Sequence, residues 1–272
     1  MSAIPTPAFP GEGLSTAKMP GHWLLARAGK RVLRPGGKEL TQRLLKTLHI
    51  GTADDVVEFA PGLGDTAEQV LRLAPHSYRL VERDPLAADR LQRRLAGENV
   101  EVLNASAESS GLPDGCASVV IAEAMLTMQP VRVKEQILRE AFRLLRPGGQ
   151  LCLHEMAIVG TEAEHLRAEI EGALALEIHH GVRPETLLGW RTLLESCGFQ
   201  IAVRMQAPMA LLEPQRLIAD EGILRAAAFL GNVFTDSETR RRVTAMRAVF
   251  HRYRDYLSAL GLIATKPVAK EF

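Results

Sequence analysis

The sequence predicts an α/β protein with a doubly wound, mostly parallel, Rossmann-like sheet of seven strands. Two observations support this fold class. Between residues 55 and 156, short apolar segments typical of buried strands alternate with segments of helical periodicity. A glycine-containing turn, APGLG at 60–64, follows the first of these strands. Such alternation builds βαβ units, whose parallel strands present their carboxyl ends at one edge, where ligands bind.

The N-terminal region precedes this pattern. Residues 1–20 are rich in proline and glycine and are expected to be coil. Residues 21–34 predict a short amphipathic helix that RPGG at 34–37 ends, and residues 38–49 repeat leucine at helical spacing. We expect the segment 1–37 to form a coil and a lid-like element beside the site.

The central region supplies most of the sheet. Proline at 85 opens one helix, and RPGG at 146–149 ends another. Strands are expected at 55–60, 77–82, 100–105, 118–124 and 150–156, with helices at 65–73, 85–95 and 133–145. The predicted core comprises Val56, Val57, Leu80, Val81, Val102, Val119, Val120, Ile121, Leu151 and Leu153.

The last third predicts helices at 161–177 and 184–196 and strands at 199–212 and 257–267. Two further helices, 214–230 and 236–256, lie between these strands as an insertion that either caps the site or forms an oligomer contact, as in a homodimer. We therefore expect one domain over residues 1–272. Its first half is 38–160, which carries most of the sheet, and its second half, with the insertion at 214–256, is 161–272.

The composition and net charge argue against several classes of function. The 272 residues carry a net charge of +1, which gives no electrostatic footprint for nucleic acid. The three cysteines are dispersed, and no His/Cys/carboxylate cluster has the spacing of a metal site. No run of 18 apolar residues and no secretory signal is found, so we expect no membrane partner and a cytoplasmic protein.

The glycine turn lies in the segment VVEFAPGLGDTA at 56–67. Asp-Thr follows Gly64, so a nucleoside-triphosphate loop, which needs Lys-Ser or Lys-Thr there, fits poorly. Gly62, Gly64 and Ala67 satisfy the G-x-G-x-x-A dinucleotide pattern. However, Phe59-Ala60-Pro61 separates the strand from the first glycine, and no substrate domain of comparable size is apparent.

A third interpretation accounts for more of the chain. The runs VVEFAPGLG (56–64), LVERDP (80–85), SAESSGLPDGCASVVIAEAM (106–125), AFRLLRPGGQLCLHEM (141–156) and LLESCGFQI (193–201) follow one another in order. Together they resemble the successive motifs of class I S-adenosylmethionine-dependent methyltransferases. The resemblance implies a seven-stranded sheet with an antiparallel last strand, and S-adenosylmethionine as cofactor, with S-adenosylhomocysteine as product.

The resemblance also implies cofactor-binding residues. Glu58 would hold the ammonium group, Glu82 the ribose hydroxyls, and Ser106 the adenine. The other residues placed around the cofactor are Ala60, Pro61, Gly62, Gly64, Arg83, Ala107 and Glu123. Ala60 departs from the family pattern, which has glycine there. Asp65 and Glu68 have capping-box spacing, which favours an N-cap role for Asp65.

Candidates for the acceptor side are less specific. The candidate catalytic residues are His154 and Glu155, near the end of a strand, and His180, before the helix at 184–196. Each has a structural alternative: a satisfied strand-end pair for the first two, and a solvated helix end for the third. His22 and Trp23 lie in the lid-like segment, where closing over the site and packing on the sheet remain open alternatives.

These observations predict methyl transfer from S-adenosylmethionine to a small-molecule acceptor by in-line displacement, which requires alignment and only in some cases a base. A non-catalytic methyltransferase-like subunit and, less favoured, an NAD(P)-dependent oxidoreductase remain alternatives. The sequence does not decide whether oxygen, nitrogen, carbon or sulfur is methylated.

Overall fold

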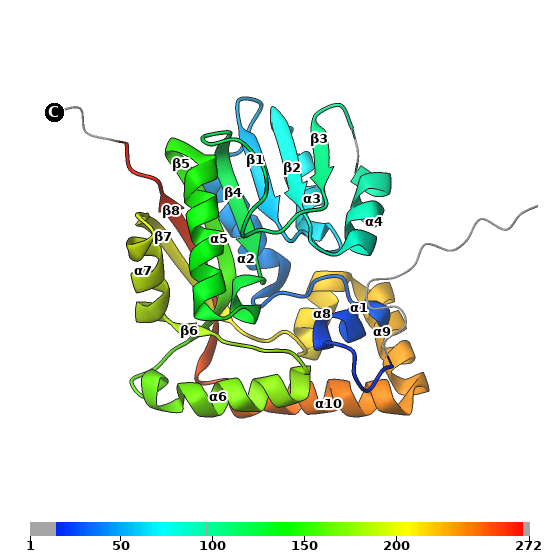
Figure 1. The fold of residues 1–272 in the computed structure, drawn as a ribbon. Helices are drawn as coiled ribbons and strands as arrows, with labels where there is room; N and C mark the ends of the chain where they lie inside the picture. The colour runs from blue at the N-terminus through cyan, green and yellow to red at the C-terminus, as the bar shows by residue number, and fades with distance from the viewer. Residues whose placement is uncertain (1–14, 96, 269–272) are drawn as a thin grey trace, which may run out of the picture.

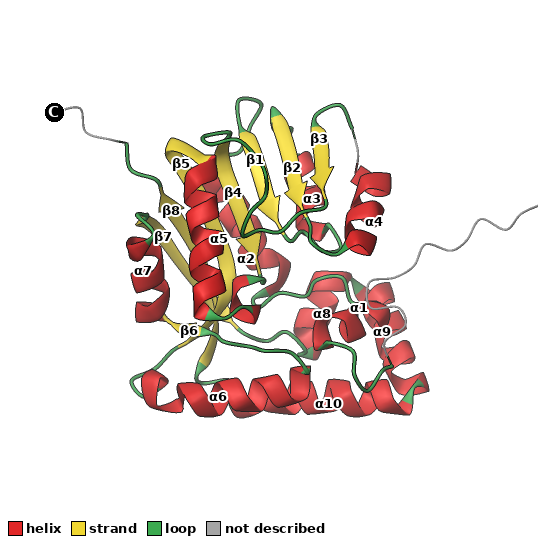
Figure 2. Cartoon of the chain, in the orientation of Figure 1, coloured by secondary structure: helices red, strands yellow, loops and turns green. Residues whose placement is uncertain are grey.

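A computed structural model describes residues 15–95 and 97–268. Figure 1 shows the chain coloured from its N-terminus, and Figure 2 shows its helices and strands. The strands are β1 (Asp55–Phe59), β2 (Ser77–Val81), β3 (Val100–Leu103), β4 (Ala117–Glu123), β5 (Leu145–Ile158), β6 (Glu185–Thr186), β7 (Gln200–Pro208) and β8 (Leu257–Thr265). The helices are α1 (Gly21–Arg27), α2 (Gly37–Leu48), α3 (Asp65–Leu71), α4 (Pro85–Leu95), α5 (Val131–Leu144), α6 (Ala163–Ile178), α7 (Leu187–Ser196), α8 (Pro214–Glu221), α9 (Ile223–Thr235) and α10 (Ser237–Arg252), with a 3-10 turn, η1 (Leu126–Met128).

The sheet has the order β3-β2-β1-β4-β5-β8-β7, and β6 pairs with β5 at its end. Strands β1 to β5 are parallel, whereas β8 runs antiparallel to both β5 and β7. The predicted α/β class, the mostly parallel sheet and the antiparallel last strand are thus confirmed. The two-residue β6 is an eighth strand, at a place where the sequence predicted the start of a helix.

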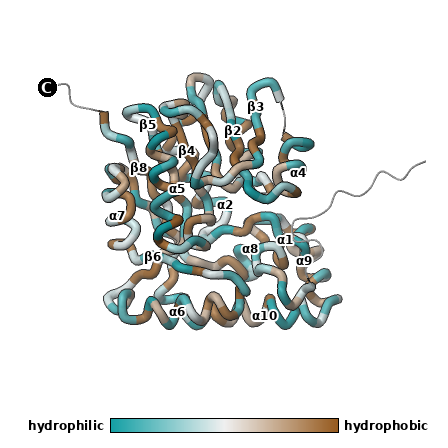
Figure 3. Tube along the Cα trace, in the orientation of Figure 1, coloured by the Kyte–Doolittle hydropathy of each residue, from teal (hydrophilic) through white to brown (hydrophobic). Residues whose placement is uncertain are grey.

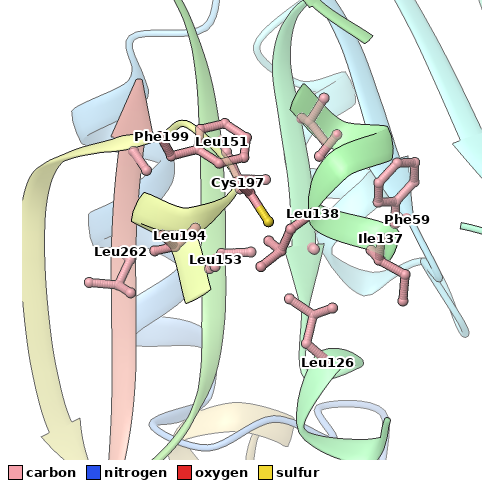
Figure 4. Close-up of a cluster of buried hydrophobic side chains, with 14 of the residues drawn as sticks. Phe59, Leu126, Ile137, Leu138, Leu151, Leu153, Leu194, Cys197, Phe199 and Leu262 are labelled. Carbon is pink, nitrogen blue, oxygen red and sulfur yellow. The ribbon is translucent and has the colours of Figure 1, made fainter. Parts of the chain in front are cut away.

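Helices cover both faces of the sheet. One apolar cluster joins α5 and α7 to one face, with Phe59, Leu138 and Leu194 among its members (Figure 4). A second cluster joins α2, α3 and α4 to the other face through residues such as Leu44, Val70 and Leu91. Figure 3 shows the apolar character of the central strands. Nine of the ten predicted core residues are buried, whereas Val102 on the edge strand β3 is only partly buried.

The remaining helices form a cap at the carboxyl ends of the parallel strands. Helices α1, α6, α8, α9 and α10 share a third apolar cluster with the end of β5, and they lie below the sheet in Figure 1. Helices α8 to α10 are inserted between β7 and β8, as the sequence predicted. Within the described residues, this arrangement places the chain that follows α1 between the cap helices and the sheet edge (Figure 1).

Several boundaries differ from the predictions. The first helix ends at Arg27 and not at residue 34, since Gly29 adopts a positive φ of 109° that an L-residue helix does not sustain. The predicted helix 214–230 is two helices, because Gly222 adopts φ 78° between α8 and α9. The strand predicted at 150–156 spans 145–158, so the RPGG segment lies within β5, between Leu145 and Gln150, which pair with Ala117 and Val119 of β4.

Candidate active site

A cavity of about 510 Å³ lies between the carboxyl ends of the parallel strands and the cap. Its volume is in the range of small-molecule and cofactor sites. The loops that follow β1, β2 and β4 line one side, and α1, residues 31–35 and the cap line the other. The site therefore lies where the sequence analysis expected the strand ends to converge.

The β1–α3 loop contributes backbone to the cavity. Ala60, Gly62 and Gly64 all have positive φ, at 49°, 54° and 74°. A Cβ atom at Gly64 would lie 2.8 Å from Leu91 Cδ2, so a larger residue would require the Leu91 side chain to move. Ala60 adopts the same left-handed region without the freedom of glycine, which marks strain at the cavity wall.

Glu82, directly after β2, contacts this loop at the edge of the cavity. Its carboxylate accepts hydrogen bonds from the backbone N–H groups of Gly62, at 3.1 Å, and Asp84, at 2.9 Å. The side chain lines the cavity and is 6% exposed, and burial raises its pKa. Glu82 is thus held in place by its neighbours while its carboxylate still borders the cavity. Arg83 lines the cavity next to it.

Glu58 lies at the cavity wall on β1 and is almost completely buried. The hydroxyl of Tyr78 donates a hydrogen bond to its carboxylate. Burial raises the pKa of Glu58 to about 8, and the nearby Glu123 carboxylate adds to the shift. The side chain is therefore mostly protonated at pH 7 in the ligand-free protein, and a cation in the cavity would favour its ionised form.

Arg34 brings a positive charge into the same region. Its guanidinium lies 2.9 Å from Asp65 Oδ2 and 3.1 Å from Glu123 Oε1. Although burial opposes ionisation, Arg34 and His154 lower the pKa of Glu123 to about 2. Asp65 is also paired with Lys38, at 3.2 Å. Helix α3 begins at Asp65, with Gly64 as its N-cap and no side-chain cap, so the predicted capping role of Asp65 is wrong.

His154 and Glu155 occupy structural positions. His154 Nδ1 lies 2.7 Å from Glu123 Oε1, and Nε2 lies 2.5 Å from the carbonyl oxygen of Pro35. His154 thus lies behind Glu123 and is not among the residues that line the cavity. Glu155 lines the cavity, but its oxygens accept four hydrogen bonds, from the N–H groups of Met125, Leu126 and Thr127 and from the Thr127 hydroxyl.

His22 and His180 lie on the cap side of the cavity. Their ring centroids are 5.9 Å apart, and the Trp23 ring lies tilted beside His22, with the two centroids 4.9 Å apart. Burial and the neighbouring His180 lower the pKa of His22 to about 4. Burial, together with Arg83 and Arg183, also lowers the pKa of His180. Both imidazoles are therefore neutral at pH 7 and can accept a proton.

An apolar chamber surrounds this histidine pair. Its walls come from the cap, from α1 and from the turn after β4, and they are rich in methionine. The apolar lining residues include Leu25, Leu33, Met125, Met128, Met156, Met209, Leu211, Met246 and Phe250. Methionine side chains adapt to ligands of different shape. The cavity thus has a charged end at the sheet and an apolar end at the cap.

The structure brings together most of the predicted site residues. Those that line the cavity are Glu58, Ala60, Pro61, Gly62, Glu82, Arg83, Glu123, Glu155 and His180. Gly64 belongs to the same loop but is not among the described residues that line the cavity. Ser106 and Ala107 do not line it either, and the Ser106 hydroxyl donates a hydrogen bond to Glu108. Arg34 was missed as a site residue. The only indication of Arg34 in the sequence is its position in RPGG, a segment that predicts the end of a helix.

Within 15–95 and 97–268, no group of three or more His, Cys, Asp or Glu side chains could hold a metal ion. Over the same residues, none of the helices combines the length and apolarity that crossing a bilayer requires.

Residues 56–149 match the family described as "Methyltransferase domain". An uncharacterized protein of Haemophilus influenzae is 31% identical over 250 residues, which cover 90% of this chain and 98% of that protein. The ubiquinone/menaquinone biosynthesis C-methyltransferase UbiE of Hahella chejuensis is 32% identical over 111 residues, or 38% of this chain and 43% of that enzyme. This chain thus spans less than half of that enzyme with detectable sequence similarity.

Among solved structures, the [4+2]-cyclase SpnF has a TM-score of 0.67 and 19% identity, covering 90% of this chain and 92% of that one. At this identity the likeness is one of fold. A fold of this kind is compatible with more than one reaction, so the reaction has to be argued from the site.

Proposed function

The chain belongs to the class I S-adenosylmethionine-dependent methyltransferase family, and on this premise we propose that it transfers a methyl group from S-adenosylmethionine to a small-molecule acceptor. The observation that carries the proposal is the two-ended cavity. Its charged end, at Glu58, Glu82 and the glycine loop, suits a cationic amino acid and a ribose. Its apolar end, at His22 and His180, suits a separate acceptor.

The residues of the charged end fit the cofactor by their chemistry. The Glu82 carboxylate, fixed by two backbone N–H groups, can accept hydrogen bonds from a ribose diol. Glu58 can lose its proton and pair with an ammonium group, while Arg34 and the backbone of the glycine loop can hold a carboxylate. When bound, S-adenosylmethionine supplies a methyl group on a positively charged sulfur.

The acceptor end has to present a nucleophile in line with that methyl group. A bound acceptor would have to place its nucleophilic atom in line with the methyl group and its bond to sulfur, and the apolar side chains of the chamber would hold it in that position. Where the acceptor carries a proton, a neutral ring nitrogen of His180 takes it. Because His154 lies behind Glu123 and Glu155 is bonded to the turn after β4, we assign both to positioning.

Titration calorimetry tests the cofactor end first, with S-adenosylmethionine, S-adenosylhomocysteine and NAD as ligands. We expect both adenosyl ligands to bind and Glu82→Ala to weaken them by about tenfold to a hundredfold, the loss of two charge-assisted hydrogen bonds. Glu101→Ala, which removes an exposed carboxylate from the neighbouring strand, is the matched control. Binding of NAD alone would overturn the proposal and favour an oxidoreductase.

A screen of apolar acceptors bearing a hydroxyl, amine or activated carbon then tests turnover. We expect methyl transfer to at least one acceptor, and loss of that transfer in His180→Gln with cofactor affinity retained. Tight cofactor binding without turnover of any acceptor would instead favour the non-catalytic alternative.

A further inference from the structure

Helix α9 exposes an apolar surface that the fold of one chain does not cover. It turns only three residues inward, Ala226, Phe229 and Val233. The α9 patch, as we call it, consists of exposed apolar side chains on α9 and on the adjacent α8: Ile218 (48% exposed), Ile223 (74%), Leu224 (87%), Leu230 (43%) and Phe234 (63%). A helix with apolar residues on nearly all sides is normally buried. A contiguous exposed patch of this kind marks an interaction surface.

The charge around this patch indicates what covers it. Residues 15–37 and 214–252, which contain α1, α8, α9 and α10 but not the cap helix α6, carry 12 basic and 4 acidic residues, whereas the rest of the chain, α6 included, carries 21 basic and 28 acidic ones. The net charge of these segments around α9 is therefore +8, and that of the remainder is −7. Two of these acidic residues, Asp220 and Glu221, and three of the basic ones, Lys30, Arg34 and Arg242, are buried, which leaves 9 basic and 2 acidic residues and a net charge of +7 on the more accessible part of these segments.

Individual basic side chains lie at both ends of α9. Arg225, in its first turn, is close enough to Arg31 that the two repel each other, which contributes to the lowered pKa of Arg31 after the effect of burial. Arg240 follows shortly after its last residue, at the start of α10. Within the described residues, Arg31, Arg225 and Arg240 form no ion pair within 4 Å, so their charges are available to an anionic partner.

We propose that the α9 patch docks this protein on an anionic membrane surface. Apolar side chains flanked by arginines are the combination that a helix lying in the headgroup region requires. A second copy of the chain is disfavoured because apposition of two such faces would bring together two strongly basic surfaces. The proposal departs from the expectation of no membrane partner, which considered only spanning segments.

Docking through α9 would place the cavity close to the bilayer. The inner residue Phe229 belongs to the same apolar cluster as Met156, Met209 and Met246, and these three methionines line the apolar chamber. An acceptor dissolved in the lipid phase would then reach the chamber without crossing water. This consequence, unlike the docking itself, rests on the proposed methyl transfer.

Sedimentation with vesicles tests the docking without any need for turnover. The full chain is mixed with vesicles of phosphatidylcholine alone or with added phosphatidylglycerol. We expect binding only where the anionic lipid is present, and a decrease with added salt. The double variant Leu224→Glu/Phe234→Glu should lower the partition coefficient at least about tenfold, because two apolar contacts are lost. Arg225→Gln should lower it about fivefold.

The control is Leu188→Glu, which puts the same charge at a 57% exposed leucine on α7, away from the cap. It should bind vesicles like the unmodified protein. Since all four residues are exposed or lie on the surface of a helix, none of these variants should impair folding, and circular dichroism verifies this. Equal binding of the double variant and the control would overturn the proposal. So would a concentration-dependent dimer that the double variant dissolves, together with no binding to anionic vesicles, since the partner would then be a second copy.

Discussion

At the scale of single residues, Glu58 has the clearest measurable property. Its carboxyl group, ordinarily with a pKa near 4.5, has a pKa of about 8 in the fold, mainly because burial disfavours its charge. The folded state therefore retains a proton that the unfolded state has already lost. Between the two pKa values the unfolded chain binds fewer protons, so the free energy of unfolding falls as the pH rises from about 5 to 8.

Glu58→Gln should remove this dependence. The amide cannot ionise, yet its oxygen can still accept a hydrogen bond from the Tyr78 hydroxyl. We expect the variant and the unmodified protein to be similar at pH 5, and the variant to be more stable at pH 9, by up to about 5 kcal/mol. Urea unfolding of the ligand-free proteins at pH 5, 7 and 9 measures this, with the exposed Glu101→Gln as control. Parallel stability curves for both proteins would rule out the raised pKa.

At the scale of elements, the end of α8 holds the chain segment that carries Arg34. Glu221 accepts hydrogen bonds from the backbone N–H groups of Arg31, at 2.7 Å, and Val32, at 2.8 Å. Asp220 accepts one from the N–H of Lys38, at 2.9 Å, and the buried ammonium group of Lys30 lies within 4.0 Å of both carboxylates. The cap insertion thus fixes both sides of Arg34 and, through it, the charged end of the cavity.

Glu221→Gln should therefore affect both stability and binding. A neutral side chain weakens two charge-assisted hydrogen bonds and leaves Lys30 with one fewer counter-charge, so we expect a loss of about 2 to 4 kcal/mol. S-adenosylhomocysteine affinity should also fall, since the position of Arg34 depends on this contact. Glu213→Gln, at an exposed ion pair with Arg247, is the matched control and should cost less than about 1 kcal/mol. Urea unfolding and calorimetry measure the two effects, and an unchanged affinity in Glu221→Gln would contradict the coupling.

Local patterns account for what the sequence could predict at this scale. The alternating apolar segments predict the positions of β1 to β5, and the glycine loop and Glu82 predict the charged end of the cavity. Both predictions are possible because each signal lies within a few residues of the chain. Arg34 could not be found in this way. Its place in the cavity depends on contacts between residues 30–38 and the acidic pair 220–221, which are far apart in sequence. Helical periodicity likewise does not reveal the break at Gly222, where the glycine adopts a φ of 78°.

At the scale of the whole molecule, the cavity is shared between two parts that differ in composition. The sheet contributes strand ends and carboxylates, and the cap contributes α1, residues 31–35 and apolar side chains. Neither part encloses the cavity alone. Since Arg34 crosses from the cap side to contact Asp65 and Glu123 at the sheet edge, a ligand at the charged end touches both parts. Binding there should reduce opening of the cap segment and not only stabilise the sheet.

Hydrogen exchange of the full chain with and without S-adenosylhomocysteine tests this coupling. Backbone amides in α1, in residues 29–36 and in the turn 124–128 should exchange more slowly when the ligand is bound, as should those of the loop 60–64. At a ligand concentration of 100 times the dissociation constant, the folded state gains about 2.7 kcal/mol, which corresponds to about a hundredfold slowing for amides that exchange through global unfolding. Amides in α7, remote from the cavity, show how much slowing arises from global unfolding alone. If protection beyond that level were confined to the loops after β1 and β2, the cap would take no part in holding the ligand, and Arg34 would serve only to join the cap to the sheet.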